Sequence, residues 1–464
     1  MPNDRLSAGG EGAINKKWVI PGHSRVLTAS SVVQVDVSYI HTYIHTKSWS
    51  RRGWCRLERA SRELSENDNW ILIQSPAALQ SVGTVTLMAG PVGEGEFRVE
   101  SDRALLAPVM RAIVKRKLML SLQAGDLPAF RRHFSLQALH LRGLEVEHIS
   151  VLPHRLDSGS PNMEVEDFLH QTGLAHVSRR DSAGWWPLHY AAMSGKLPLI
   201  EALLRQRADP NRRTAKDEPK MGFPFWVSAL DLALCYKHNE VARMLIAARA
   251  KLEGGIAPST TPAAGADNAE GIRILCAARA DLRARNLFGM GALETAAGLG
   301  CRAALEELVR HTQPSCWELS LALNIAVMNP TGSAEIVEFL VNLRANVDYQ
   351  YDPRRGLSRL GRLLFAAKSF QHTWGKATQL TATAYHSYGR TPLMAALQTA
   401  QHEGAAALIS LGARLDVKNL RGWTALDFAK EQSIPQWLRQ GLEGDTAECD
   451  RVTALALPYV ETSL

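Results

Sequence analysis

Apolar residues recur in paired blocks between about residue 180 and residue 440. The first block of each pair has the form Leu-x-x-Ala, and a second apolar block follows it after a short polar break. Because residues three or four apart share one face of a helix, each block predicts a short amphipathic helix and each pair predicts a helix–turn–helix unit. The first blocks begin at Leu188, Leu230, Leu293, Leu323, Leu393 and Leu426, and a less regular unit opens at Thr261.

Seven such units begin at near-constant intervals. Aligned on one position they mark Trp186, Ser228, Thr261, Gly291, Leu321, Thr391 and Thr424, so that the steps are 42, 33, 30, 30, 70 and 33 residues. A single unit of this size cannot bury its own apolar face, whereas a stack of units builds a continuous core. We therefore predict a mostly α-helical solenoid of about seven units over residues 166–445, with insertions near residues 212–222 and 353–388.

The most complete unit begins with Gly184-Trp-Trp-Pro-Leu-His-Tyr-Ala-Ala192 and ends with Ala208-Asp-Pro-Asn211. It resembles the ankyrin repeat, whose pattern is Gly-x-Thr-Pro-Leu-His-x-Ala, and the units at Gly389 and Gly422 match that pattern best after it. His189 is the only histidine that keeps its motif position. The resemblance, over about residues 180–440, implies helix pairs with short hairpin tips and a concave face that binds other proteins. It names no partner.

Candidate partner-binding residues follow from the same resemblance. The residue after the motif glycine is expected to point towards the hairpin tip, and aromatic and arginine side chains carry much of the affinity at protein interfaces. For each tryptophan the alternative is packing between adjacent units, which we favour for Trp186. The candidates are Trp185, Met290, Arg390 and Trp423 at the tips, and Tyr190 in the first helix.

The positive charge of the chain is confined to one segment. The 464 residues have a formal net charge of +7 and a pI near 9.1. Residues 353–402 contain no Asp or Glu and seven Lys or Arg, so the remainder of the chain is electrically balanced. This pattern argues against a diffuse nucleic-acid-binding surface, and no nucleic-acid partner is expected.

Within that segment, residues 354–376 form a basic amphipathic pattern. Leu357, Leu360, Leu364, Ala367, Phe370 and Trp374 share one face of a predicted helix, and Arg355, Arg359, Arg362 and Lys368 accompany them. Such a helix suits an acidic groove, a calmodulin-like partner or an anionic membrane surface. The alternative, which the sequence favours, is that its apolar face packs on the neighbouring repeats.

The shorter insertion, residues 212–222, is polar and contains Pro and Gly, so it predicts an extended hairpin tip. A tip in this place either contacts a partner or is a tolerated solvent-exposed loop, and we favour the loop.

The sequence has no pattern typical of a metal site, a cofactor site or a membrane span. The six cysteines are scattered without metal-ligand spacing, and no phosphate-binding glycine loop or hydrolase motif is present. No run approaches the roughly 18 apolar residues that a membrane span needs. We expect no metal, no cofactor and no membrane span, and a cytoplasmic protein with reduced thiols.

The N-terminal third divides into three predicted parts. Residues 1–47 have low complexity and are predicted to be disordered, residues 48–103 form a small α/β segment, and residues 104–165 form a helical cap for the array. A strand is predicted at Trp70–Ile73. Residues 446–464 are expected to form a C-terminal tail.

Trp54-Cys-x-x-Glu58 in the α/β segment resembles the Trp-Cys-x-x-Glu motif of TIR domains. In TIR domains that cleave NAD this glutamate is the catalytic carboxylate, so Glu58 is the candidate catalytic residue. The residues before Trp54 lack the βαβ pattern and glycine-rich turn of a TIR domain. This favours the alternative that Trp49 and Trp54 anchor the core of a small α/β segment and that Glu58 lies on a solvated helix face, which is compatible with a truncated or inactive relative of the TIR fold.

The sequence as a whole therefore favours a non-catalytic scaffold or adaptor that binds proteins through the concave face of an ankyrin array. The alternative is an ankyrin-regulated signalling protein with a TIR-like, NAD-cleaving N-terminal segment.

Overall fold

The structure is a computed structural model of the chain. It describes residues 52–65, 70–75, 78–82, 90–153, 163–218, 223–328, 334–375, 378–432 and 434–457. The predicted disordered segment, residues 1–47, lies outside the described residues.

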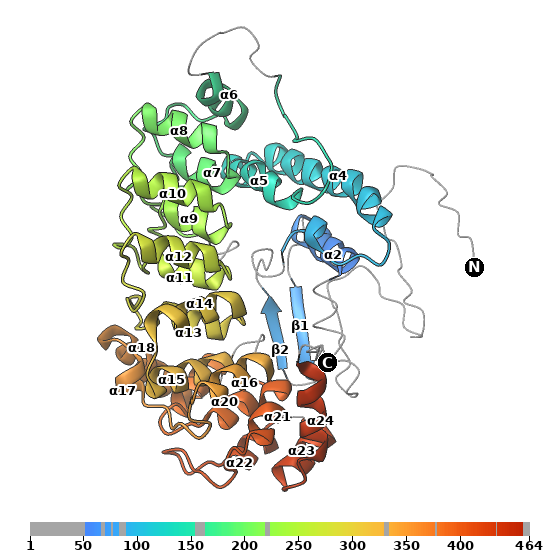
Figure 1. The fold of residues 1–464 in the computed structure, drawn as a ribbon, viewed down its shortest axis with the longest axis vertical. Coiled ribbons are helices and arrows are strands. Elements are labelled where there is room, and N and C mark those ends of the chain that lie inside the picture. The colour runs from blue at the N-terminus through green and yellow to red at the C-terminus, as the bar shows by residue number, and fades with distance from the viewer. Residues whose placement is uncertain are drawn as a thin grey trace, which may run out of the picture.

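Seven helix pairs form the array within the described residues, which confirms the predicted solenoid (Figure 1). First helices contact first helices along the stack. Second helices contact second helices from α8 to α14 and from α16 to α23, and α16 meets α21 across the long insertion. The pairs are α7 (Pro187–Ser194) with α8 (Leu197–Arg205), α9 (Ala229–Cys235) with α10 (Asn239–Ala247), α11 (Thr260–Gly265) with α12 (Ala269–Ala277), α13 (Ala292–Gly298) with α14 (Arg302–Thr312), α15 (Cys316–Ala326) with α16 (Ala334–Asn342), α20 (Pro392–Gln398) with α21 (His402–Ser410), and α22 (Ala425–Lys430) with α23 (Gln436–Leu442).

A side chain three residues into the first helix of a unit accepts a hydrogen bond at the start of that helix. The bond is kept in three units where a carboxylate replaces the motif histidine. In the first unit the Trp186 N–H donates to His189 Nδ1 at 3.0 Å. Elsewhere a carboxylate three residues into the helix accepts the same kind of bond, as Asp231 does from the Ser228 N–H at 2.8 Å. Such capping boxes satisfy backbone donors that the helix start leaves free. Glu294 and Asp427 accept equivalent bonds in their units.

The stack continues upstream of the first unit. Helix α5 (Leu127–His140) packs on α7, and α6 (Met163–Thr172) packs on α8. Phe130 of α5 belongs to a smaller core shared with α2 (Gly53–Glu63) and α4 (Ser101–Gln123), while Leu136 and Leu139 belong to the core of the array. Helix α5 therefore links the two apolar cores.

The segment around residues 48–103 contains α2, a short 3-10 helix (Val92–Glu94) and a two-stranded antiparallel sheet of β1 (Trp70–Ser75) and β2 (Ala78–Val82). The strand predicted at Trp70–Ile73 is confirmed. Trp54 is 48 % exposed, and its indole N–H donates to Asp102 Oδ2 at 3.0 Å, so the prediction that it anchors the core is wrong. Trp49 lies outside the described residues. The resemblance to TIR domains stays a prediction.

The far end of the array is covered by a helix where a tail was expected. Helix α24 (Ala447–Ala456) packs on α21 and α23, and it buries Cys449 and Val452. The tail prediction is wrong for these residues because the end of a solenoid exposes apolar surface that a further element covers.

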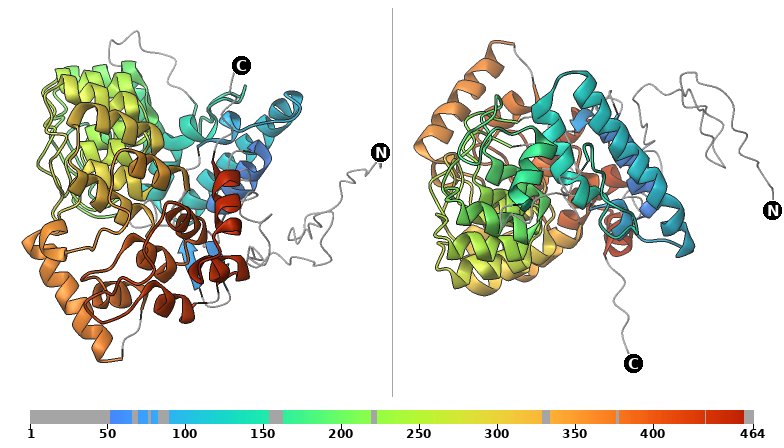
Figure 2. Two further views of the ribbon diagram at one scale, coloured as in Figure 1. Left: turned by 60° about the horizontal axis from the view of Figure 1, so that its bottom comes forward. Right: turned by 90° about the horizontal axis from the view of Figure 1, so that it is seen from above.

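The long insertion forms α17 (Pro353–Gly356), α18 (Arg359–Thr373) and α19 (Gln379–Tyr385). Helix α18 lies along α19, and Gly361 is its only buried residue. The helix projects from the array, in orange in Figure 2. The prediction that its apolar face packs on the repeats is wrong, because the face that meets the protein is a different one.

No helix among the described residues is long and apolar enough to span a membrane.

Candidate protein-binding surface

Trp185 and Tyr190, two of the candidate partner-binding residues, lie in the core. Their exposed fractions are 1 % and 0 %. The Trp185 ring packs against Tyr190 at 5.5 Å and against Phe223 at 6.3 Å between ring centroids. The Tyr190 hydroxyl donates to Asp181 Oδ2 at 2.6 Å, and burial raises the pKa of this tyrosine. Both predictions are wrong, because the hairpin insertion brings Phe223 over this position.

Arg390 is also buried, with an exposed fraction of 1 %. Its guanidinium donates to Gln398 Oε1 at 2.9 Å and to Asn324 Oδ1 at 3.4 Å, and burial lowers its pKa to about 10. Asn324 belongs to α15 and Gln398 to α20. Arg390 therefore joins two repeats across the insertion, and the prediction that it faces a partner is wrong.

Met290 and Trp423, the other two tip candidates, are half-buried. The Trp423 ring lies 4.4 Å from His386 and 5.1 Å from Phe428 between centroids, so part of it packs within the array. Their role in partner binding stays a prediction.

The structure reveals an exposed aromatic pair that the sequence analysis missed. The insertion is an extended hairpin, as predicted, because the Thr214 N–H donates to Val227 O at 2.9 Å and the Trp226 N–H donates to Thr214 O at 3.0 Å. Phe225 and Trp226 are 45 % and 53 % exposed at its end. The sequence feature that could have identified this pair is two adjacent aromatic residues shortly before Ser228, the residue that caps α9.

Trp226 has a left-handed backbone, with φ of 65°. Bulky residues rarely adopt this conformation, and such strain persists only where the surroundings impose it. The imposed geometry includes the bond from Arg213 Nη1 to the Trp226 carbonyl at 3.0 Å. The hairpin therefore holds an indole at the surface in a fixed backbone conformation.

A hollow of about 470 Å³ lies between the first two tips. We call it the tip hollow. Its volume falls in the range of sites that take a small ligand or part of a peptide. Trp186 is fixed beside it because the indole N–H donates to Arg213 O at 3.3 Å and the Arg212 guanidinium stacks 4.8 Å from the ring centroid. The residues that define the hollow here are Arg180, Trp186, Arg212, Arg213, Thr214 and Trp226.

The tip hollow is electropositive. Arg212 pairs with Asp209 at 3.3 Å, and Arg213 lies 3.5 Å from Asp231. Arg180 is exposed and forms no ion pair with any part of the chain that the structure describes. Its guanidinium can therefore pair with a carboxylate or phosphate of another molecule.

The hairpin is fixed to α5 and to the segment just before the first repeat unit. Arg132 of α5 pairs with Glu218 at 2.7 Å, and both side chains are largely buried. The Lys216 ammonium donates to Ser182 O at 2.8 Å. The first arm of the hairpin is thus fixed at Lys216 and Glu218, so the tip hollow has a defined shape before any partner arrives.

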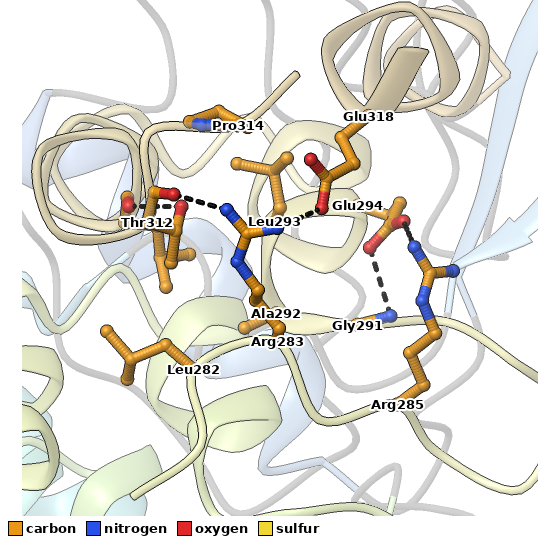
Figure 3. A pocket seen from close by; sticks show the side chains of 11 residues that line it. Leu282, Arg283, Arg285, Gly291, Ala292, Leu293, Glu294, Thr312, Pro314 and Glu318 are labelled. Atoms are coloured by element: carbon orange, nitrogen blue, oxygen red, sulfur yellow. Dashed lines mark hydrogen bonds and ion pairs between the residues drawn. The ribbon is translucent and has the colours of Figure 1, made fainter. Parts of the chain in front are cut away.

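A second pocket, between α13 and α15, is a joint between repeats (Figure 3). Its volume of about 20 Å³ suits a single water molecule. Arg283 pairs with Glu318 at 3.1 Å and Arg285 pairs with Glu294 at 2.8 Å. These contacts connect neighbouring units and leave no room for a ligand.

The remaining candidate residues lie apart from the tip hollow in sequence and in element. Glu58 is exposed on α2, and no group of three or more potential metal ligands occurs among the described residues. In the long insertion Arg355, Arg359 and Arg362 are exposed, Lys368 is half-buried and Trp374 is 77 % exposed.

The comparison with protein families agrees with the repeat pattern at the most complete unit. Residues 183–215 match the ankyrin-repeat family model. Among solved structures, the human ASB11 ankyrin repeat domain is 20 % identical with a TM-score of 0.40, covering 60 % of this chain and 100 % of that chain. The ankyrin repeat domain of Bcl-3, a member of the IkappaB protein family, is 19 % identical with a TM-score of 0.36, covering 57 % of this chain and 100 % of that one. No curated protein matches the chain.

Proposed function

We propose that this chain, which carries an array of ankyrin repeats, is a non-catalytic scaffold or adaptor that binds partner proteins through its hairpin tips and first helices. Ankyrin repeats are generally protein–protein interaction modules. The observation that carries the proposal is the tip hollow, where the Trp186 and Trp226 indoles adjoin three arginines.

The composition of the tip hollow suits a protein partner. Tryptophan and arginine are the residue types that most often dominate interface energetics when they sit in well-defined pockets. Trp226 is 53 % exposed and its backbone is fixed, so binding would order little that is not already ordered. The unpaired Arg180 favours a partner segment with an acidic group beside an apolar side chain.

Photo-crosslinking at the tip hollow tests this proposal. A photoreactive amino acid at position 226 of the full chain should capture a defined partner from a cell lysate. The same amino acid at position 54, a tryptophan of similar exposure at 48 % on α2, is the matched control. Capture at position 226 that disappears in the Arg180→Glu variant supports the proposal, and equal capture at both positions contradicts it.

Absence of catalysis is a separate part of the proposal. The purified full chain should not turn over NAD, and the Glu58→Ala variant should be indistinguishable from it. Turnover that the Glu58→Ala variant loses would overturn the non-catalytic assignment and support the TIR-like alternative.

A further inference from the structure

Helix α18 carries an apolar stripe that no element among the described residues covers. Leu363, Phe370 and Trp374 are 67 %, 63 % and 77 % exposed, and Leu360 and Leu364 are 39 % and 43 % exposed. The Phe370 and Trp374 rings contact each other at 5.6 Å between centroids. Soluble proteins rarely expose a contiguous apolar surface without a use for it.

The stripe faces outwards because the opposite side of α18 packs against the rest of the protein. The His372 ring lies 4.7 Å from the Tyr385 ring of α19, and Gly361 is buried. A Cβ at position 361 would come within 2.6 Å of the Phe288 carbonyl oxygen, so only glycine permits this close approach. At 100° per residue, positions 361 and 372 fall on the same side of the helix, and positions 363, 370 and 374 fall on the other.

The start of α18 is fixed to a hairpin tip of the array. The Ser358 N–H donates to Phe288 O at 3.1 Å, and the Ser358 hydroxyl donates to Leu287 O at 2.7 Å. Leu287 and Phe288 are themselves 52 % and 41 % exposed. The two bonds from Ser358 hold the start of α18 against the array on the side that carries Gly361.

The segment that carries the stripe has charged side chains of one sign only. Arg355, Arg359 and Arg362 are exposed within it. Residues 353–402 contain no acidic side chain. An anionic surface would therefore meet no like charge from this segment of the chain, and each arginine near it contributes attraction.

We propose that α18 attaches the protein to an anionic membrane surface, with its apolar stripe in the headgroup region and its arginines among the lipid phosphates. Interfacial helices combine an apolar face bearing Trp, Phe and Leu with a basic face in this way. The 15 residues of α18 span about 22 Å, so the whole stripe can lie parallel to the membrane plane.

Access to the helix favours a membrane over an acidic protein groove. Helix α19 lies along one side of α18, so a partner that closes around the helix would have to displace it. A surface that approaches from one direction reaches the exposed stripe without any rearrangement. None of the residues that line the tip hollow belongs to the long insertion, so the two surfaces can be tested independently.

Co-sedimentation of the full chain with vesicles tests the proposal. Binding should be at least about tenfold tighter to phosphatidylcholine vesicles that contain phosphatidylserine than to pure phosphatidylcholine, and molar salt should weaken it. The triple variant Leu363→Ser, Phe370→Ser, Trp374→Ser should reduce binding by at least about tenfold, because it removes the apolar contribution. The replaced side chains are exposed, so the fold should be unaffected.

Two controls make the outcome decisive. The Leu105→Ser variant changes an apolar residue of similar exposure, 62 %, on α4 and should bind vesicles like the unmodified chain. Purified calcium-loaded calmodulin serves as the acidic-groove probe. Equal binding to both vesicle types, equal loss in the Leu105→Ser variant, or binding to calmodulin with no binding to vesicles would each overturn the membrane proposal.

Discussion

Four repeat units end in an arginine with a left-handed backbone, a conformation that usually favours glycine. The equivalent position at the end of a later unit is Gly412, which has φ of 82°. A Cβ added to Gly412 would touch nothing within 4 Å. A left-handed conformation costs a residue with a side chain about 1–2 kcal/mol relative to glycine. The arginines with positive φ at these exits are Arg207 (62°), Arg249 (65°), Arg279 (62°) and Arg344 (73°).

We predict that Arg279→Gly stabilises the protein. The gain should be about 0.5 kcal/mol, because the relief of backbone strain exceeds the added entropy of glycine in the unfolded chain. The reverse change, Gly412→Arg, should destabilise by a similar amount, about 0.5 kcal/mol. Urea unfolding measures both. A loss of stability in Arg279→Gly would mean that the arginine side chain makes a contact worth more than the strain.

Buried histidines should make the stability depend on pH. Burial lowers the pKa of His140, His189, His386 and His402 to about 4, against an ordinary value of 6.5. Between these values the unfolded chain binds more protons than the folded one, so folding is weakened as pH falls from 6.5 towards 4. Unfolding free energy should drop by more than about 1 kcal/mol from pH 7 to pH 5.

The control for this prediction is a variant that removes one titrating group. His402→Gln should have a shallower decline with pH than the unmodified chain when both are unfolded in urea across the same range. A pH profile that is flat from 7 to 5 would contradict the assignment of neutral, buried imidazoles.

Among the elements, α18 and α20 differ most in how the protein covers them. All seven residues of α20 are buried, whereas α18 buries only Gly361. We expect the backbone amides of α18 to exchange with deuterium faster than those of α20, because few contacts must break to open α18. Exchange mass spectrometry measures this. Equal protection of the two helices would mean that another part of the chain covers the apolar stripe.

The same element illustrates a limit of sequence patterns. The spacing of Leu360, Leu364 and Trp374 identified an amphipathic helix, and α18 is one. The pattern could not say which face the protein covers, because that depends on α19 and on the Phe288 carbonyl next to Gly361.

Across the whole molecule, Arg131 of α5 ties the N-terminal helices to the array. It pairs with Asp181 at 3.1 Å, and its guanidinium also donates to the carbonyl oxygens of Thr172 and Gly173. We predict that Arg131→Met costs about 3–5 kcal/mol, because it leaves the buried Asp181 carboxylate without its cationic partner. The exposed pair of Arg142 with Glu94 is the control, and Arg142→Met should cost at most about 1 kcal/mol.

Thermal or urea unfolding measures both variants, and similar small losses would contradict the linking role of α5. A loss confined to the N-terminal helices, with the array still folded, would show that the two cores unfold separately.

The positions of the repeats, their two-helix form and the extended hairpin could be predicted from the sequence, because each rests on local periodicity or turn composition. The residues that face outwards could not be predicted from the sequence. Trp185 and Arg390 are in contact with Phe223 and Asn324, which lie 38 and 66 residues away in the chain. Burial of such positions is set by the neighbour that stacks on them, so the tip hollow and the exposed stripe of α18 emerged only once the units were assembled.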